Sequence, residues 1–401
     1  MYDSMKSFRP SRLPLVIVLA MMFSICAFAS SVARTTKTDS TTKISETPKT
    51  QKRMTQLRHA RLTRRVVRRR HRSFERFYTS SFANDLTSGD LTAGEDPVVR
   101  QAALDALGNM NGTVVAIDPS SGRILAMVNQ KLALSGGAQP CSTIKLSVAL
   151  AALNEHIVSR DTEVPLGRRY SMNLTSALAH SNNAYFESLG RRLGFEKVSY
   201  YAHEYGLGEL AGYNIDGEHV GVFPSEVLAS KLGGVGKMCS FGESISMTPL
   251  QLGALVSAIA NGGTLYYLQH PQSPVELTNF QPKVKRQLDI APLIPEMKDG
   301  MLGAVMYGTA RSVRYNFSEE EILGKTGTCS NNGTRFGWFA SYANTDYGRI
   351  VTVVFLQGGR PTFGPKAAEI AGRLYRNLYD HSFFTNTSVH AQQSPTANSA
   401  Q

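Results

Sequence analysis

Strand-like runs lie at both ends of the central part of this chain, and helical patterns fill the stretch between them. Two apolar and β-branched runs, 112–118 and 123–129, are joined by Pro-Ser-Ser-Gly, which is typical of a hairpin turn. Three similar runs follow at 320–328, 335–343 and 349–357. The pattern predicts an α+β fold in which helices flank one antiparallel sheet built from both ends of the domain, with an inserted all-helical subdomain. A cleft between the sheet and the insert is the expected place for a functional site.

Apolar residues recur three and four positions apart in several stretches of this region. One helix is expected to begin near Ser142 and to continue through Leu153. Further helices are expected within 177–194, 248–263 and 365–380.

Composition divides the chain into four parts. We assign 1–30 to a signal or anchor segment, 31–84 to a basic linker, 85–382 to the folded domain and 383–401 to a polar tail. The linker is expected to be disordered or partly helical and the tail disordered, because neither contains enough apolar surface to form a core.

The N-terminal segment has the pattern of an export signal. Lys6, Arg9 and Arg12 precede 17 uncharged residues, 13–29, which end in small residues that suit a signal peptidase. As a helix this segment would be roughly 26 Å long, at the short edge of a membrane span. We expect a domain outside the cytoplasm, anchored in the cell membrane or secreted if the leader is cleaved, and the sequence leaves that choice open.

Most of the net charge of +12 lies in one run. Residues 51–76 contain eleven Lys or Arg and one acid, so the rest of the chain is nearly neutral. The run is interpreted as a solvated tether, or as a segment that adheres to anionic headgroups or wall polymers. Nucleic acid is not expected as a partner of an exported chain. Protein partners and the oligomeric state are not indicated.

A serine and a lysine stand three residues apart at the start of the first predicted helix, in Pro-Cys-Ser-Thr-Ile-Lys. In a helix this spacing brings the amine of Lys145 to the hydroxyl of Ser142. A serine is a weak nucleophile until a base takes its proton, and lysine serves as that base when burial or nearby positive charge lowers its pKa. The spacing alone is not specific, because Ser40 and Lys43 in the linker share it.

The only Lys-Thr-Gly of the chain lies on a predicted strand and is followed by Thr328. Gly327 allows a substrate backbone to approach the strand closely. We expect Lys325 and the hydroxyl of Thr328 on the same side of the strand, where a cation and a hydroxyl suit a substrate carboxylate.

A Ser-x-Asn motif between two helices would complete the set. The chain contains three such motifs: Ser171-Met-Asn173, Ser181-Asn-Asn183 and Ser330-Asn-Asn332. We select Ser181 and Asn183, because only this pair is followed directly by a strongly amphipathic helix that would fix a short polar loop at the cleft.

The three motifs in this order, Ser-Thr-Ile-Lys, Ser-Asn-Asn and Lys-Thr-Gly-Thr, resemble those of the penicillin-binding transpeptidases and the related serine β-lactamases. The flanking stretches GTVVAIDPSSGRILAMV, FGESISMTPLQLGALVSAIANGG and GWFASYA also look like the transpeptidase domain, so the resemblance covers roughly residues 98–380.

The resemblance implies acyl transfer from peptidoglycan stem peptides, which cross-links the cell wall. Ser142 would attack the bond between two terminal D-alanines, and Lys145 would take its proton. Ser181 would pass a proton to the departing amine, and Lys325 would hold the charge pattern that this transfer needs. No metal or organic cofactor is implied, and β-lactam antibiotics are expected ligands.

The resemblance also implies a set of binding residues. Asn183 would bind a substrate amide, and Thr326 and Thr328 would hold the terminal carboxylate beside Gly327. The backbone N–H groups of Ser142 and Thr328 would form the oxyanion hole, each worth on the order of 3 kcal/mol.

Three other activities stay open. Ser142 and Ser181 are only 39 residues apart, which suggests an open cleft and allows a D-alanyl-D-alanine carboxypeptidase with water as acceptor. A serine β-lactamase would need rapid attack of water on the acyl-enzyme, but no Ser-Asp-Asn motif with a downstream glutamate base is visible. A non-catalytic penicillin-binding sensor would be acylated without processing a stem peptide.

The cysteines outside the leader allow at most one disulfide. They are Cys141, Cys239 and Cys329, and the sequence does not say which of them pair. A bond between Cys141 and Cys329 is conceivable because both flank the proposed site. Cys141 is otherwise expected to pack as a small buried residue rather than act as the nucleophile.

Overall fold

The computed structural model describes residues 75–345 and 348–385. The predicted leader at 1–30, the linker up to residue 74 and the tail from residue 386 lie outside the described residues. Every helix in the described ranges is too short or too polar to span a lipid bilayer.

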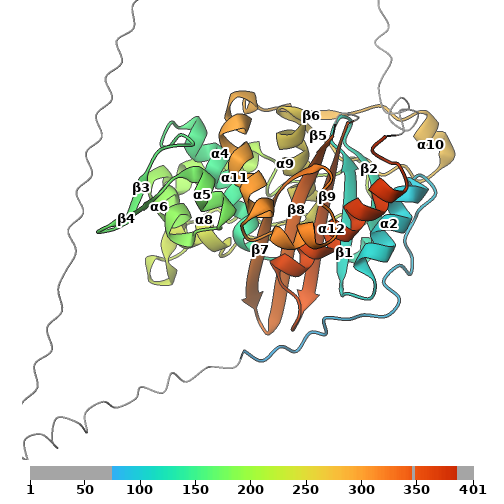
Figure 1. The fold of residues 1–401 in the computed structure, drawn as a ribbon, viewed down its shortest axis with the longest axis horizontal. Helices are drawn as coiled ribbons and strands as arrows, with labels where there is room; N and C mark the ends of the chain where they lie inside the picture. The colour runs from blue at the N-terminus through green and yellow to red at the C-terminus, as the bar shows by residue number, and fades with distance from the viewer. Residues whose placement is uncertain (1–74, 346–347, 386–401) are drawn as a thin grey trace, which may run out of the picture. The chain divides into compact units, whose positions relative to one another are not determined.

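Five antiparallel strands form the central sheet, in the order β2-β1-β9-β8-β7 (Figure 1). They are β1 (Gly112–Asp118), β2 (Arg123–Val128), β7 (Glu321–Asn331), β8 (Thr334–Thr345) and β9 (Gly348–Gly358). The N-terminal hairpin joins the C-terminal strands where Val114 of β1 lies opposite Val354 of β9. The prediction of one sheet assembled from two distant parts of the chain is therefore confirmed, and it leaves β7 at an edge.

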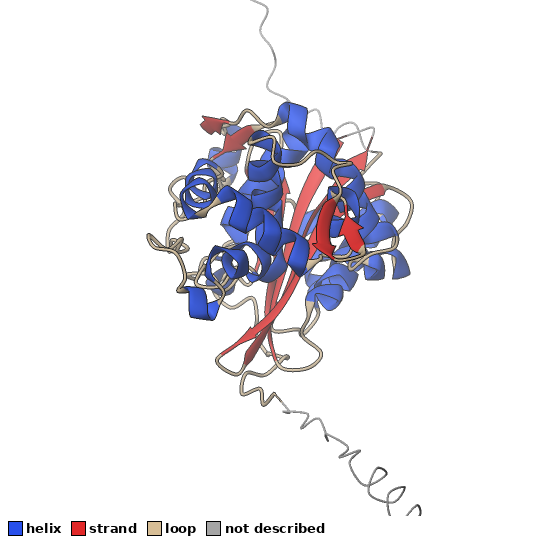
Figure 2. Ribbon diagram, turned by 90° about the vertical axis from the view of Figure 1, so that its left-hand side faces the viewer, coloured by secondary structure: helices blue, strands red, loops and turns tan. Residues whose placement is uncertain are grey.

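Helices cover both faces of this sheet (Figure 2). On one face, α2 (Pro97–Leu107) and α12 (Gly364–Asp380) pack with Val114 and the other strand residues of the same orientation. On the other face, α9 (Pro249–Asn261) packs with the alternate residues, such as Val115. Because both faces are buried, the strands read as nearly continuous apolar runs.

The chain between β2 and β7 forms the insert, which is mainly helical. Its α-helices are α3 (Gln130–Ala133), α4 (Lys145–Asn154), α5 (Leu174–Ala179), α6 (Asn183–Leu193), α7 (Phe195–Glu204), α8 (Gly234–Phe241), α9, α10 (Pro274–Thr278) and α11 (Ile294–Met306). Short 3-10 turns occur at η1 (Cys141–Ile144), η2 (Ser230–Leu232), η3 (Ala291–Leu293) and η4 (Arg311–Tyr315).

The insert differs from the all-helical prediction by two small antiparallel sheets. One pairs β3 (Val164–Gly167) with β4 (Tyr170–Met172), and the other pairs β5 (Thr264–Tyr266) with β6 (Val284–Gln287). Strands of three or four residues are too short to leave a clear alternating pattern, which is why the sequence did not reveal them.

Local sequence determines both ends of α9. The Thr248 hydroxyl accepts from the N–H of Gln251, whose side chain accepts in turn from the N–H of Thr248, and Pro249 occupies the first turn. Gly262 ends the helix with a φ of 95°, a conformation that glycine adopts without strain. The helix predicted from this pattern is confirmed.

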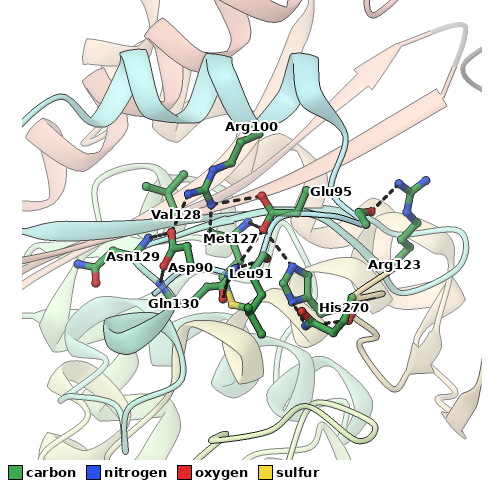
Figure 3. A network of polar contacts seen from close by, with 12 residues as sticks. Asp90, Leu91, Glu95, Arg100, Arg123, Met127, Val128, Asn129, Gln130 and His270 are labelled. Atoms are coloured by element: carbon green, nitrogen blue, oxygen red, sulfur yellow. Dashed lines mark hydrogen bonds and ion pairs between the residues drawn. The ribbon is translucent and has the colours of Figure 1, made fainter. Parts of the chain in front are cut away.

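A buried polar network fastens the segment before α2 to the end of β2 (Figure 3). Arg100 pairs with Asp90 at 2.7 Å and with Glu95 at 3.2 Å. Asp90 also accepts from the N–H of Gln130 at 2.8 Å, and Glu95 lies 3.0 Å from the Nε2 of His270. Because these buried polar groups satisfy one another, the network stabilises the start of the domain.

The packed region extends slightly beyond the boundaries expected from composition. The N–H of Tyr78 donates to the carbonyl of Gly333 at 2.9 Å, so residues placed in the linker already contact the β7–β8 hairpin. At the other end, Phe383 and Phe384 are buried in the core that includes α12. Aromatic residues next to a polar segment are thus part of the fold rather than of the tail.

Candidate active site

Ser142 lies in a tight turn just before α4. The residues Cys141–Ile144 form a 3-10 turn, and the α-helix begins at Lys145, three residues later than predicted. Cys141 has a left-handed backbone with a φ of 53°, which a regular right-handed helix does not contain. Residues three apart eclipse in a 3-10 turn, so the Nζ of Lys145 still lies 2.9 Å from the Oγ of Ser142.

Four oxygen atoms surround the amine of Lys145, whose side chain is fully buried. Besides Ser142 Oγ, Nζ lies 2.8 Å from the carbonyl oxygen of Ser181, 3.0 Å from its Oγ and 2.6 Å from the Oδ1 of Asn183. The carbonyl and amide oxygens can only accept, so a neutral amine donates its two N–H groups to them. The lone pair of the amine is then free to accept the proton of the Ser142 hydroxyl.

Burial and a neighbouring cation favour the neutral form of Lys145. Its pKa is lowered to about 6, chiefly by desolvation and in addition by the positive charge of Lys325, while the charge of Glu187 acts in the opposite direction. Desolvation also lowers the pKa of Lys325 to about 7. An amine with a pKa near 6 is mostly unprotonated at neutral pH, as a general base must be.

Ser181 lies in the loop between α5 and α6, as predicted. Its backbone is left-handed, with a φ of 54°, and the next residue, Asn182, caps α6 by accepting from the N–H of Tyr185 at 2.9 Å. This sharp entry into α6 directs both Ser181 and Asn183 toward Lys145. The other two Ser-x-Asn motifs lie elsewhere, since Asn173 caps α5 and Ser330 stands near the end of β7.

Lys325 reaches the same point from β7. Its buried Nζ donates to the Oγ of Ser181 at 2.8 Å and to the carbonyl of Thr326 at 2.9 Å. The hydroxyl of Ser181 therefore lies between the amines of Lys145 and Lys325. The structure brings all four residues predicted to be catalytic into one hydrogen-bonded group.

One face of β7 is turned toward the nucleophile turn. Lys325 and Cys329 point to this face, and Cys329 forms a disulfide with Cys141. Gly327 lies between them in the same orientation, where an added Cβ would meet the carbonyl oxygen of Pro140 at 2.8 Å. The glycine therefore permits a close approach of the strand to the protein's own turn as well as to a substrate.

The threonines of β7 point to the opposite face, and this corrects one expectation. The Thr326 hydroxyl donates to the Oγ1 of Thr309 at 2.6 Å, and the Thr328 hydroxyl accepts from the N–H of Gly364 at 2.7 Å. The expected placement of Lys325 and Thr328 on one side of the strand is wrong. Side chains alternate along a strand, so residues three apart point in opposite directions.

A cavity of about 670 Å³ opens over the nucleophile. It is lined by five of the predicted residues: Ser142, Ser181, Asn183, Thr326 and Thr328. Lys145 and Lys325 are buried beneath these groups. The arrangement places one hydroxyl, its base and several hydrogen-bonding groups around a single reaction centre.

Sequence reasoning missed several residues that line the same cavity. They include His180, Thr309, Arg311, Arg335 and Phe363. These residues come from separate elements and form no motif, so no local signal identified them. Arg311 and Arg335 bring two positive charges to the cavity wall, which also includes the carboxylate of Glu369, and these cations suit an anionic substrate.

The disulfide joins residues that directly flank the site. Cys141 precedes Ser142, Cys329 follows Thr328, and their Cα atoms are 5.5 Å apart. Cys239 is a free and buried thiol in the described part of the chain. Burial raises its pKa, which keeps it protonated.

Comparison with known protein families and curated proteins gives a consistent result. The family model of the penicillin binding protein transpeptidase domain matches residues 112–379. Stage V sporulation protein D of Bacillus subtilis is 28% identical over 317 residues, which cover 66% of this chain and 48% of that protein. The peptidoglycan D,D-transpeptidase MrdA of Acinetobacter baumannii is 24% identical over 363 residues, which cover 72% of this chain and 53% of that protein. This chain thus spans about half the length of these two relatives.

Solved structures share the fold. The crystal structure of Pseudomonas aeruginosa PBP2 in complex with WCK 5153 has a TM-score of 0.60 and 23% identity, and the match covers 72% of this chain and 77% of that one. A peptidoglycan glycosyltransferase from Burkholderia ambifaria has a TM-score of 0.60 and 18% identity, with coverage of 73% and 99%. The matched family region is most of the chain and contains all three motifs. The chain therefore belongs to the penicillin-binding protein transpeptidase domain family.

Proposed function

We propose that this chain is a serine D,D-transpeptidase that forms an acyl-enzyme with peptidoglycan stem peptides and cross-links the cell wall. The observation that carries the proposal is the 2.9 Å contact between the Nζ of Lys145 and the Oγ of Ser142, in surroundings that lower the pKa of the lysine to about 6. The relatives named peptidoglycan D,D-transpeptidase, MrdA and PbpA, support it.

In the first step the Oγ of Ser142 attacks the carbonyl carbon of the penultimate D-alanine, and its proton passes to the Nζ of Lys145. The N–H groups of Ser142 and Thr328 are proposed to bind the developing oxyanion. The hydroxyl of Ser181, in contact with both amines, relays a proton to the departing amine. The terminal D-alanine leaves, and the stem peptide stays on Ser142 as an ester.

In the second step an amine of another stem peptide attacks this ester. Its proton passes through Lys145 back to Ser142, the ester bond breaks and a new amide joins the two stems. A β-lactam would acylate the same serine and would block this step.

The hydrogen bonds of the two threonines favour Thr328 as the donor to the substrate's terminal carboxylate. Its oxygen already accepts from the N–H of Gly364, so its own O–H is free to point into the cavity. Thr326 instead donates to Thr309. Asn183 is proposed to bind a substrate amide at the cavity wall.

The domain is proposed to act outside the cytoplasm, held at the cell membrane by residues 13–29 or released after cleavage. The basic start and the apolar segment support export. The Cys141–Cys329 disulfide adds support, because such bonds persist in oxidising compartments.

Mass spectrometry of the full chain tests the proposal. Incubation with a penicillin should add one acyl group to Ser142, and incubation with a stem pentapeptide plus an acceptor stem should release D-alanine and yield a cross-linked product. Release of D-alanine with water as the only acceptor would instead identify a carboxypeptidase, and fast hydrolysis of the penicillin a β-lactamase. An adduct without any peptide processing would identify a sensor, and no adduct on Ser142 would contradict the proposed nucleophile.

A further inference from the structure

The Cys141–Cys329 disulfide bridges the two segments that carry the proposed oxyanion donors. Cys141 is the residue before Ser142, and Cys329 is the residue after Thr328. The bond connects positions 188 residues apart in sequence. The disulfide therefore links the segment that carries one donor N–H group to the segment that carries the second. Each donor lies one residue from a bonded cysteine.

The turn at Cys141 is held in a conformation that it would not adopt alone. Its φ of 53° is left-handed, and for a residue other than glycine this costs on the order of 1–3 kcal/mol unless the surroundings impose it. The Nε1 of Trp338 donates to the carbonyl of Gln139 at 3.0 Å, which holds the turn to the sheet just upstream. Packing in the core and the disulfide both act on Cys141 itself, and the disulfide is the covalent restraint.

The end of β7, which carries Cys329, also needs a restraint. β7 is an edge strand, and its burial decreases along its last residues, from fully buried Lys325 through half-buried Cys329 to exposed Asn331. An edge strand that leaves the core pairs with a neighbour on one side only. The bond to Cys141 therefore fixes the end of β7 against the nucleophile turn.

We propose that the Cys141–Cys329 disulfide is a positioning element of the acylation site, and that full activity requires its oxidised form. The inference rests on the proposed function. Neither cysteine is among the residues that line the cavity over Ser142, so both would act through the adjacent N–H groups of Ser142 and Thr328. These two groups must reach a single oxygen at about 3 Å, and a displacement of about 1 Å can cost on the order of a hundredfold in rate.

The bond can be broken reversibly from its half-buried side. A thiolate of dithiothreitol attacks the Sγ of Cys329, and the reagent then closes into a cyclic disulfide. Two electrons and two protons pass to the protein, the Sγ–Sγ bond breaks and both cysteines become thiols. The strand end is then free to separate from the turn, and Cys141 is free to relax.

The test measures acylation of the full chain by a fluorescent penicillin before and after reduction, and separates the acylation rate constant from the preceding binding constant. We expect reduction to lower the rate constant by about ten- to a hundredfold, with the binding constant nearly unchanged, and reoxidation to restore it. The double variant Cys141→Ser/Cys329→Ser should be as slow as the reduced chain and insensitive to dithiothreitol. The matched control Cys239→Ala should respond to reduction like the unaltered chain.

Circular dichroism and thermal unfolding of the reduced chain distinguish positioning from a purely structural role. Slow acylation by a folded reduced chain supports the inference. Equal rate constants in both redox states, an effect confined to the binding constant, or unfolding on reduction would each overturn it. Failure of the oxidised chain to form any acyl-enzyme would instead refute the proposed function, and the inference with it.

Discussion

Lys145 and Lys325 place their amines 3.0 Å and 2.8 Å from one oxygen, the hydroxyl of Ser181. Both side chains are fully buried, so two positive charges at this distance would repel strongly with little screening by water. Lys145 has the lower pKa and also contacts Ser142, which makes it the amine that is neutral and accepts the proton. Lys325 then keeps the positive charge.

The rate of acylation should depend on pH through these two amines. Below a pH of about 6 Lys145 becomes protonated and cannot accept the Ser142 proton, so the rate should rise as the pH increases through this value. Above a pH of about 7 Lys325 loses its charge, and the rate should then level off or fall. Acylation by a penicillin measured from pH 4.5 to 9 checks this, and a rate that does not change between pH 5 and pH 7 would contradict it.

Replacing Lys325 with methionine removes its charge while nearly keeping its volume. We expect Lys325→Met to slow acylation by on the order of a hundredfold and to move the acidic limb of the pH profile to higher pH, because the cation that lowers the pKa of Lys145 is lost. The domain should stay folded. Lys298→Met, at a partly exposed lysine on α11, is the control. Unchanged kinetics in Lys325→Met would remove Lys325 from the site.

Removing the nucleophile should abolish acylation. Ser142→Ala should form no adduct with a fluorescent penicillin while unfolding at nearly the same temperature, because only one oxygen is lost. Cys141→Ala should still be acylated at Ser142, although more slowly. Labelling on a denaturing gel with intact-mass analysis measures both, and the reverse pattern would show that the assignment of the nucleophile is wrong.

A methyl group at Gly327 should disturb the contact between β7 and the nucleophile turn. The added Cβ of Gly327→Ala would lie 2.8 Å from the backbone carbonyl oxygen of Pro140, which cannot move without moving Ser142. We expect a loss of about 1–3 kcal/mol in the free energy of unfolding together with slower acylation. In the control Gly136→Ala the added methyl group meets no atom within 4 Å, so its stability should change by less than about 0.5 kcal/mol. Equal denaturation midpoints for the two variants would refute the argument.

Deletion of residues 51–76 tests the Arg-rich run. The truncated chain should bind less to anionic liposomes or isolated cell wall, because the run carries most of the net positive charge. The difference should shrink as the salt concentration rises. Unaltered partitioning at low salt would show that the run is only a tether.

Much of the framework could be predicted from the sequence because its signals are local. The strands that contain Val114 and Val354 appear in the sequence as continuous apolar runs. The sequence of α9 likewise contains the residues that begin and end the helix. The order of the three motifs likewise identified Ser142, Lys145, Ser181 and Lys325 as one group. The spacing of apolar side chains and the residues that form turns depend on neighbours in the chain, so these features can be recognised without knowing any long-range contact.

Only the tertiary structure decided how these residues act together. Asn183 proved to be a hydrogen-bond partner of Lys145, Thr328 proved to face away from Lys325, and Cys141 proved to pair with Cys329. Arg311 and Arg335 entered the cavity from elements that carry no motif. Burial, the distance between two amines and the partner of a sulfur atom depend on groups far apart along the chain, and these are the quantities that determine the pKa of the base and the geometry of the oxyanion site.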